Sequence, residues 1–292
     1  MIPSVIVIGG ANMDIGGSPS GDFRLHDSNP GVVHLRPGGV GRNIAHNLHL
    51  LGAQVSLITA LGEDFFGEAL RRSCGELGLD LSMSLSVRDL RTSTYLYLYD
   101  GSGELHAAIA DMGVTARLTP DYLRRWLPRL ERADAVVLDA NLSQESIEFL
   151  CENCHVPLYA DPVSSAKATR LKNVLPYLTA IKPNALEAEL LTAEHEATMA
   201  ARELMARGVR RVFISMGAQG MLAAEGEDVL KLPALSCEVV NTTGAGDAAM
   251  AAIVWSGIRG ADLAESAMAA LSAGAQTAAC STTVNPRLTL DE

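Results

Sequence analysis

Long apolar segments and a surplus of positive charge are both missing from this 292-residue sequence. No uninterrupted apolar run approaches the roughly 18 residues of a membrane span, and the N-terminus lacks the basic stretch and cleavage pattern of a signal peptide. Lys and Arg total 23 against 34 Asp and Glu, a formal net charge of −11. Such a surface repels nucleic-acid phosphates, so we expect a small-molecule ligand and no nucleic acid. The missing membrane span and signal peptide lead us to expect a cytoplasmic protein that does not bind a membrane.

Cysteine is scarce and scattered. The five cysteines are an odd number, which argues against a disulfide framework and for reduced thiols. Cys151, Cys154 and His155 match the letters of a c-type haem attachment site. Such attachment requires export, which the sequence does not signal, and the string lies between a helical stretch and a strand-like one. We interpret it as the end of a helix; a haem or metal site is the alternative.

Aromatic residues make up only 4% of the chain although 48% is hydrophobic, and the surplus is Ala, Leu, Val and Gly. These are the usual materials of helices layered on a parallel sheet. Short buried strands are predicted at residues 4–8, 55–60, 135–139, 156–161, 179–182 and 211–215. Helices are predicted at residues 41–51, 65–77, 120–131, 144–153, 186–192, 197–207 and 248–257. The alternation implies right-handed βαβ crossovers in one α/β domain over residues 1–292, with a mostly parallel central sheet.

Two segments interrupt this alternation. Residues 15–36 contain Gly, Ser, Pro and Asp in place of a helix. Residues 85–110 are predicted to form two strands, 93–99 and 104–110, around an Asp-Gly-Ser-Gly turn. We interpret the two segments as a small β lid on the main domain; a pair of surface hairpins is the alternative.

The strongest local signal is Asn241-Thr-Thr-Gly-Ala-Gly-Asp247, which opens an Ala-rich helical stretch. A glycine-rich turn at a helix start exposes unpaired N–H groups at the positive end of the helix dipole, so Gly244, Ala245 and Gly246 are candidate phosphate donors. An acidic residue there would repel the phosphate. Asp247 therefore makes more sense as a base beside the reacting oxygen. The alternative is an aspartate that simply favours the first helical turn.

A second glycine-rich turn, Gly38-Gly-Val-Gly-Arg-Asn43, precedes another predicted helix. Such turns are common at strand-to-helix junctions, and a structural role is the alternative. The turn lacks the G-x-G-x-x-G spacing and its acidic partner, which disfavours a nicotinamide cofactor and a dehydrogenase-like domain. The sequence also has no G-x-x-x-x-G-K-[ST] string, so the P-loop route to ATP is absent.

Together the two turns resemble the two signatures of the ribokinase-like (PfkB) family of carbohydrate and nucleoside kinases. Between them, Lys182-Pro-Asn184-Ala-Leu-Glu187 is similar to the family's N-x-x-E element, and Ser215-Met-Gly217-Ala-Gln-Gly220 to its nucleotide-binding strand end. The similarity runs from about Val5 to about Pro286. It implies a ribokinase-like α/β fold and transfer of a phosphoryl group from ATP to an alcohol, with Asp247 as the base.

Other strings are closer to nucleoside kinases of this family than to ribokinase itself. They are Gly10-Ala-Asn12-Met-Asp14, Asp27-Ser-Asn-Pro-Gly31, residues 37–45, Asp111-Met112 and Asp161-Pro-Val-Ser164. The resemblance implies a nucleoside whose ribose 5′-hydroxyl accepts the phosphoryl group. Another sugar or nucleoside kinase is the nearest alternative. A non-catalytic nucleoside or sugar sensor is a more distant one, because a binder has no use for the base in the Gly-Ala-Gly-Asp string.

The resemblance also implies the substrate contacts. The residues expected to hydrogen-bond the ribose hydroxyls are Asn12, Asp14, Gly39 and Asn43. Carboxylates and amides suit this role because an analogue that lacks a hydroxyl leaves them unpaired. On the predicted lid, Asn29 and Thr92 would face the base or sugar and Asp111 would close over it. For Asp14, a capping or turn role is the alternative.

For the nucleotide, the resemblance implies a longer set of contacts. The expected ATP-binding residues are Lys167, Asn184, Ser215, Gly217, Gly220, Gly244, Gly246 and Gly274. Asn184 and Glu187 would organise Mg²⁺, largely through water, because a hard cation keeps much of its hydration shell. Lys167 would neutralise charge on the transferring phosphoryl group. The alternatives are a solvent-facing helix turn and a merely solvated lysine.

Two departures from the family pattern limit this transfer. Ribokinase has Asp where this chain has Asn241, and that Asp helps to bind a monovalent cation, so the lost charge argues against K⁺ activation. The chain ends soon after Asn285, where relatives often continue into another helix. The adenine pocket near Ala273 and Gly274 is therefore expected to be built differently. The family often pairs lids into dimers, and the apolar string at 95–99 predicts a homodimer through the lid.

Overall fold

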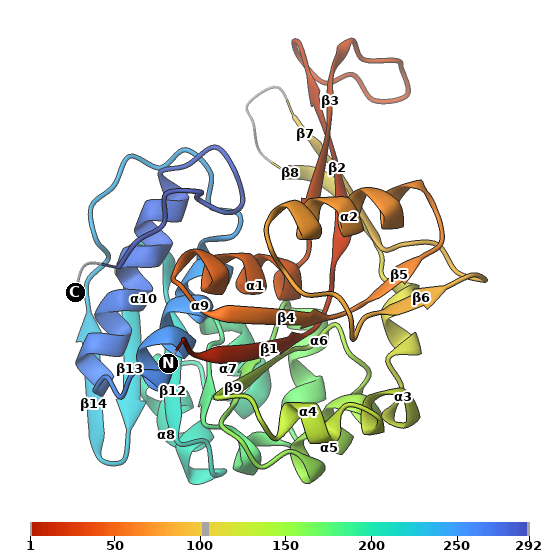
Figure 1. The fold of residues 1–292 in the computed structure, drawn as a ribbon. Coiled ribbons are helices and arrows are strands. Elements are labelled where there is room, and N and C mark those ends of the chain that lie inside the picture. The colour runs from red at the N-terminus through yellow and green to blue at the C-terminus, as the bar shows by residue number, and fades with distance from the viewer. Residues whose placement is uncertain (1, 101–104, 291–292) are drawn as a thin grey trace.

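An eight-stranded sheet forms the centre of the computed structural model, which describes residues 2–100 and 105–290 (Figure 1). The strand order is β14-β13-β12-β11-β10-β9-β1-β4. Every pairing from β4 to β12 is parallel, and β13 and β14 join antiparallel at one edge. The strands are β1 (Ser4–Ile8), β4 (Gln54–Ile58), β9 (Ala135–Asp139), β10 (Leu158–Asp161), β11 (Ala180–Ile181), β12 (Arg211–Ser215), β13 (Met221–Glu225) and β14 (Asp228–Leu232).

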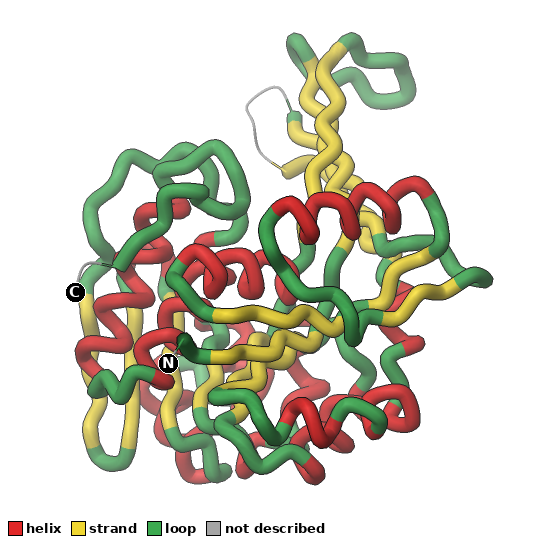
Figure 2. Tube along the Cα trace, in the orientation of Figure 1, coloured by secondary structure: helices red, strands yellow, loops and turns green. Residues whose placement is uncertain are grey.

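Helices cover both faces of this sheet (Figure 2). They are α1 (Val40–Leu50), α2 (Phe65–Glu76), α3 (Pro120–Arg124), α4 (Leu127–Leu130), α5 (Gln144–Asn153), α6 (Ser165–Ala168), α7 (Ala185–Thr192), α8 (Ala197–Ala206), α9 (Ala245–Ile258) and α10 (Leu263–Ala278). Among the described residues, no helix combines the length and apolarity needed to cross a membrane.

Alternate residues of β1 show how the two faces are filled. Val5 and Val7 pack in a cluster with α1, α9 and α10, whereas Ile6 and Ile8 pack in another with α5, α7 and α8. The strand is buried on both sides, which explains why its sequence is a continuous apolar run and does not alternate.

A separate four-stranded sheet, called the small sheet below, projects from the main body (Figure 1). Its order is β3-β2-β7-β8, formed by β2 (Asn12–Pro19), β3 (Gly31–Gly38), β7 (Thr94–Tyr99) and β8 (Leu105–Asp111). The strands predicted around residues 93–99 and 104–110 correspond to β7 and β8. Residues 101–104, which carry most of the predicted turn, lie outside the described part of the chain. A two-stranded sheet of β5 (Ala60–Gly62) and β6 (Leu85–Val87) completes the strands.

The predicted α/β architecture with a mostly parallel sheet is confirmed. Several elements match closely: β1, β9, β12 and α5 begin and end at the predicted residues. The helix predicted at 120–131 is wrong in one respect, because it is broken into α3 and α4. Pro128 lies at the start of α4, where its missing N–H is tolerated, whereas in the middle of one long helix it would cost a hydrogen bond.

Candidate active site

Three charged side chains lie at the carboxyl ends of neighbouring parallel strands. Asp139 ends β9, Asp161 ends β10, and Lys182 follows β11. Asp139 is fully buried and accepts hydrogen bonds from the N–H groups of Gly10, at 2.8 Å, and Asn141, at 2.9 Å. Lys182 Nζ lies 3.3 Å from Asp161 Oδ2, and both side chains are only 6% exposed. The carboxyl edge of an open parallel sheet is where ligands bind in such folds.

The glycine-rich turn at 244–246 brings a fourth charge to this edge. Gly244 caps α9 with φ +86°, and a Cβ on it would lie 1.9 Å from the carbonyl oxygen of Thr283, so only glycine fits. The helix then starts at Ala245. The N–H groups of Gly246 and Asp247 stand in the first turn, where no intrahelical acceptor exists. The turn therefore has the form of an anion site.

Asp247 follows this turn and meets the first glycine-rich segment. Asn43 Nδ2 donates to Asp247 Oδ2 over 2.9 Å, which joins α1 to α9. Burial and the nearby Asp161 raise the pKa of Asp247 to about 7, although the Asn43 hydrogen bond and Lys182 act in the opposite direction. A carboxylate with a pKa near neutrality is well suited to accept a proton as a general base.

Lys182 belongs to the site and was missed as a candidate by the sequence analysis. A Cβ built on Gly246 would lie 3.4 Å from Lys182 Nζ, so the ammonium faces the start of α9. Burial lowers the pKa of Lys182, but Asp161, Glu187 and Asp247 outweigh it, so the pKa is raised and the side chain stays charged. A lysine directly after a buried strand was the available signal.

Strand β2 carries a polar pair at its start. Asn12 Nδ2 donates to Asp14 Oδ1 over 2.6 Å. Burial raises the pKa of Asp14 to about 6, against the lowering effects of Asn12 and Arg42. A Cβ on Gly38 would lie 2.1 Å from Asp14 Oδ2, so the glycine turn packs directly against this carboxylate.

Gly39 has a similar packing role. Its φ is +103°, and a Cβ there would lie 2.5 Å from the carbonyl oxygen of Gly10. The turn thus packs against Gly10 and Asp14, next to the residues expected at the substrate end.

The three predicted lid contacts are less well placed. Thr92 is 1% exposed, and its hydroxyl donates to Asp64 Oδ1 at 2.7 Å and accepts from the Gly62 N–H at 2.9 Å. These bonds give Thr92 a structural role, so its hydroxyl is not placed to contact a substrate. Asn29 closes its own loop by bonding the backbone of Arg24, and Asp111 is exposed at the end of β8.

Three of the predicted nucleotide contacts line one pocket. Asn184 and Ser215 are bridged through their backbones, and both line a pocket of about 950 Å³ together with Gly217. Gly220 shapes the same turn, since its φ is +94° and a Cβ would lie 2.0 Å from the Leu232 carbonyl oxygen. Gly274 lies on α10 near the start of α9. A Cβ built on Gly274 would lie 3.5 Å from the Ala245 carbonyl oxygen.

Asn184 and Glu187 form a capping box at the start of α7. Asn184 Oδ1 accepts from the Glu187 N–H at 2.9 Å, and Glu187 Oε2 accepts from the Asn184 N–H at 2.8 Å. Glu187 is buried, which together with Asp161 raises its pKa, and its second carboxylate oxygen is not used by the cap. Lys167 donates to Asn141 Oδ1 over 2.6 Å, so it is not simply solvated.

A metal ion would find few direct ligands here. The described residues contain no group of three or more His, Cys, Asp or Glu side chains that could hold one. The free oxygen of Glu187 fits Mg²⁺ held through water and phosphate, the arrangement that this cation favours.

The string Cys151 to His155 lies at the end of α5. Cys154 caps the end of α5, as the helix-end interpretation predicted. Both thiols are buried, which raises the pKa of Cys151 to about 12 and that of Cys154 to about 11. His155 is exposed, and its Nδ1 lies 3.2 Å from Glu131 Oε1. Protonated, buried thiols are poor metal ligands.

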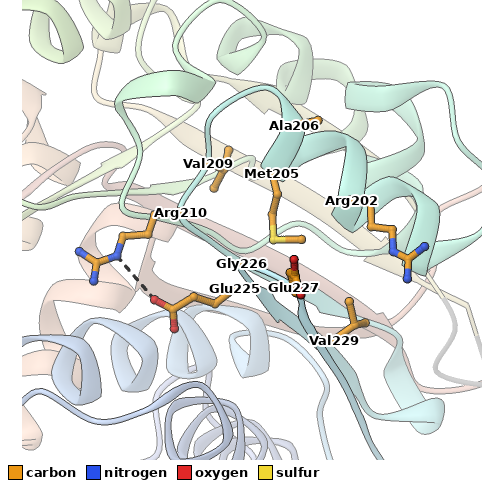
Figure 3. Close-up of a pocket in the computed structure, with 9 residues that line it drawn as sticks. All are labelled: Arg202, Met205, Ala206, Val209, Arg210, Glu225, Gly226, Glu227 and Val229. Atoms are coloured by element: carbon orange, nitrogen blue, oxygen red, sulfur yellow. Dashed lines mark ion pairs between the residues drawn. The ribbon is translucent and has the colours of Figure 1, made fainter.

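Another hollow lies between α8 and the β13–β14 hairpin, away from the catalytic candidates (Figure 3). Arg210 and Glu225 pair across it at 3.5 Å. None of the residues predicted to bind substrate or nucleotide lines it.

The fold and this site define the class of protein. Residues 3–290 match the pfkB family carbohydrate kinase model, and the chain belongs to this family. It is therefore a phosphotransferase with an alcohol group as acceptor, acting on a sugar or nucleoside. The family resemblance predicted from the two glycine-rich signatures is confirmed.

The chain is similar over most of its length to several sugar and nucleoside kinases. The chain is 36% identical to the pseudouridine kinase of Escherichia coli K12, over 98% of this chain and 94% of the relative. It is 33% identical to the uncharacterized sugar kinase YeiI of the same organism, over 98% of this chain and 81% of that one. The ribokinase structure from Thermotoga maritima superposes with a TM-score of 0.87 at 22% identity, covering 98% of this chain and 97% of the other, so the ribokinase-like fold is confirmed.

Proposed function

We propose that this chain transfers the γ-phosphoryl group of ATP to the ribose 5′-hydroxyl of pseudouridine, giving pseudouridine 5′-phosphate and ADP. The observation that carries the proposal is the placement of Asp247, which stands at an anion-binding helix start and contacts Asn43 of the predicted ribose site. The substrate is inferred from the strings at 10–14, 27–31 and 37–45, which resemble pseudouridine kinase, and from the 36% identity to that enzyme.

In this proposal Asp247 is the catalytic base. Its Oδ2 is held by Asn43, so Oδ1 is left to accept the proton of the 5′-hydroxyl. The N–H groups of Gly246 and Asp247 bind the phosphoryl oxygens, whereas the Ala245 N–H donates to the Thr242 carbonyl oxygen at 3.3 Å. The Lys182 ammonium offsets the charge that grows on the phosphoryl group. Asn12 and Asp14 bind the ribose hydroxyls and hold the acceptor oxygen in line.

The nucleotide occupies the pocket beside Asn184, Ser215 and Gly217. Glu187 would hold Mg²⁺ through water, and the cation would supply neutralisation of phosphate charge. Lys167 lies at the sheet edge near Asn141 and adds positive charge there. Gly274 lies beside the catalytic turn, where the adenine pocket would end. Asn241 Oδ1 accepts from the Thr243 N–H at 3.0 Å and brings no charge, so we propose no monovalent-cation site.

We infer that the small sheet acts as the lid. Asp14, Tyr95 and Arg36 are cross-strand neighbours on the face that carries the substrate residues. Arg36 Nη1 donates to the Ser281 carbonyl oxygen over 3.0 Å, so this sheet contacts the loop whose Thr283 packs against Gly244. Closure of this sheet would exclude water, the competing acceptor.

The opposite face of the small sheet supports a homodimer. Val33, Leu35, Leu96 and Ile109 share that face and are 40–70% exposed. Of the string predicted for this contact, 95–99, only Leu96 is strongly exposed, because the tyrosines point to the other face.

The buried free thiols fit the reducing cytoplasm expected from the sequence.

A nucleoside panel tests the substrate. Purified protein is assayed with ATP and Mg²⁺ against pseudouridine, uridine, adenosine, ribose and a ketose, with ADP and the phosphorylated acceptor as the products measured. We expect kcat/KM to be highest for pseudouridine. Faster turnover of ribose, of another nucleoside or of a ketose would assign the chain to another member of the family, and the base and phosphate sites would be unchanged.

A further inference from the structure

Arg42, the residue before Asn43, is a buried cation that the reaction described so far does not use. Its side chain lies on α1 and the residue is 6% exposed. Among the described residues, no carboxylate lies within ion-pair distance of its guanidinium. Nη1 donates to Asn43 Oδ1 at 3.3 Å, Nη2 donates to Ser73 Oγ at 3.2 Å, and Nε has no partner. Burying an arginine without a carboxylate partner is costly, so a role beyond packing is expected.

The chemistry of the three groups explains the arrangement. Arg42 is a donor only, and the ionised Asp247 is an acceptor only. The Asn43 amide between them has one oxygen and one NH₂ group, so a single orientation satisfies both neighbours. In that orientation Oδ1 accepts from Arg42 and Nδ2 donates to Asp247. A flipped amide would set donor against donor and acceptor against acceptor.

We propose that Arg42 is a positioning residue for phosphoryl transfer, which locks the Asn43 amide so that its NH₂ group always faces Asp247. The consequence is a base with one oxygen held and the other directed to the acceptor hydroxyl. This inference rests on the proposed role of Asp247 as the base. It does not depend on which sugar or nucleoside is the substrate.

The surroundings of Arg42 keep this lock in place. Burial of His46, together with the charge of Arg42, lowers the pKa of that histidine to about 4, so the imidazole adds no second positive charge beside Arg42. Cys74 of α2 lies beside the guanidinium, and its own pKa is raised by burial, so it stays a neutral thiol. Asp14 is the charged group that faces Arg42 from the small sheet.

A double-mutant cycle tests the lock. The variants are Arg42→Met, which keeps the aliphatic bulk, Asn43→Ala, and the two combined, each assayed with the substrate that the native protein turns over fastest. If Arg42 acts through the Asn43 amide, Arg42→Met lowers kcat by about 10- to 100-fold in the native background and by less than about 3-fold in the Asn43→Ala background. KM for ATP stays the same.

Two further variants separate positioning from folding. Arg42→Lys keeps a charged donor near Asn43 Oδ1 and is expected to restore part of the lost kcat. Arg72→Met changes an exposed arginine on α2 and leaves kcat unchanged. Thermal melting and ATP binding, measured on every variant, show whether the protein is folded.

The pKa of Asp247 gives a readout that needs no turnover. Charged groups that face Asp247 are Asp161, Lys182 and Asp139, and none of them is altered by Arg42→Met. Loss of the ordered Asn43 hydrogen bond should raise the pKa of Asp247 above its value of about 7. Carbon-13 NMR of the Asp247 carboxyl carbon measures this pKa.

Equal effects of Arg42→Met in both backgrounds, or an unchanged pKa of Asp247, would overturn the lock. Absence of phosphoryl transfer by the native protein would instead overturn the proposed function. The NMR titration separates the two failures, because it tests the contact between Asn43 and Asp247 without any substrate.

Discussion

Lys182 and Asp161 form a buried ion pair at the edge of the central sheet, and both charges act on Asp247. Lys182 lowers the pKa of Asp247, whereas Asp161 raises it. The pKa of about 7 therefore reflects burial together with two opposed charges. The two partners can be removed one at a time, which makes the balance testable.

Replacing either partner should move the pH dependence in opposite directions. In the proposed mechanism Asp247 acts in its ionised form, so kcat/KM should rise with pH through a pKa near 7. Lys182→Met removes a stabilising cation and should move this acid limb to higher pH. Asp161→Asn removes a repelling anion and should move it to lower pH. The measurement is kcat/KM between pH 5 and 9 for each variant.

Lys172→Met, at an exposed position, is the control and should leave the profile in place. Shifts of the same sign for Lys182→Met and Asp161→Asn would show that the ion pair acts only as a structural unit.

The turn proposed to bind phosphate should tolerate no side chain at Gly244. A Cβ there meets the Thr283 carbonyl oxygen at 1.9 Å, so Gly244→Ala must displace the turn or the 281–283 loop. We expect kcat to fall by at least about 10-fold and the melting temperature to drop. Gly260 has a similar φ of +80° but open space around it.

Gly260→Ala is therefore the matched control, which carries the backbone strain of about 1 kcal/mol without the clash. Its kcat should remain native. If Gly244→Ala behaved like Gly260→Ala in both kcat and melting temperature, the close contact with Thr283 would have no functional importance.

The exposed apolar face of the small sheet should mediate self-association. Ile109 is 67% exposed on that face, and Ile109→Glu places a charge where a partner sheet would pack. Size-exclusion chromatography with light scattering should show a dimer for the native chain and a monomer for Ile109→Glu. Met268→Glu changes an exposed apolar residue of α10 and should remain dimeric. A monomeric native chain would remove this part of the proposal.

Local patterns in the sequence predicted the elements that depend on neighbouring residues. The glycine turns at 38–43 and 244–246 were predicted because a glycine string followed by a helix is a local signal. The antiparallel β13–β14 hairpin and α10 were missed. Both carried local signals, namely the Gly226 turn and the Asp262–Glu265 capping box of α10, which were not recognised.

The polar contacts that complete the site were beyond local reasoning. The pairing of Lys182 with Asp161 and the bond from Asn43 to Asp247 join residues far apart in the sequence, so only the packing of the sheet brings them together. Thr92 shows the reverse case. The family resemblance implied a substrate contact for Thr92, but the hydroxyl is used to hold Asp64 at the start of α2.

The most direct measurement is turnover and ligand binding by Asp247→Asn. Asparagine keeps the size of the side chain and can still accept from Asn43, but it cannot take a proton from the acceptor hydroxyl. We predict that kcat falls by about 10²- to 10⁴-fold while the dissociation constants for ATP and nucleoside, measured by calorimetry, stay within a few-fold of native. An Asp247→Asn protein with near-native turnover would contradict the assignment of this carboxylate as the base.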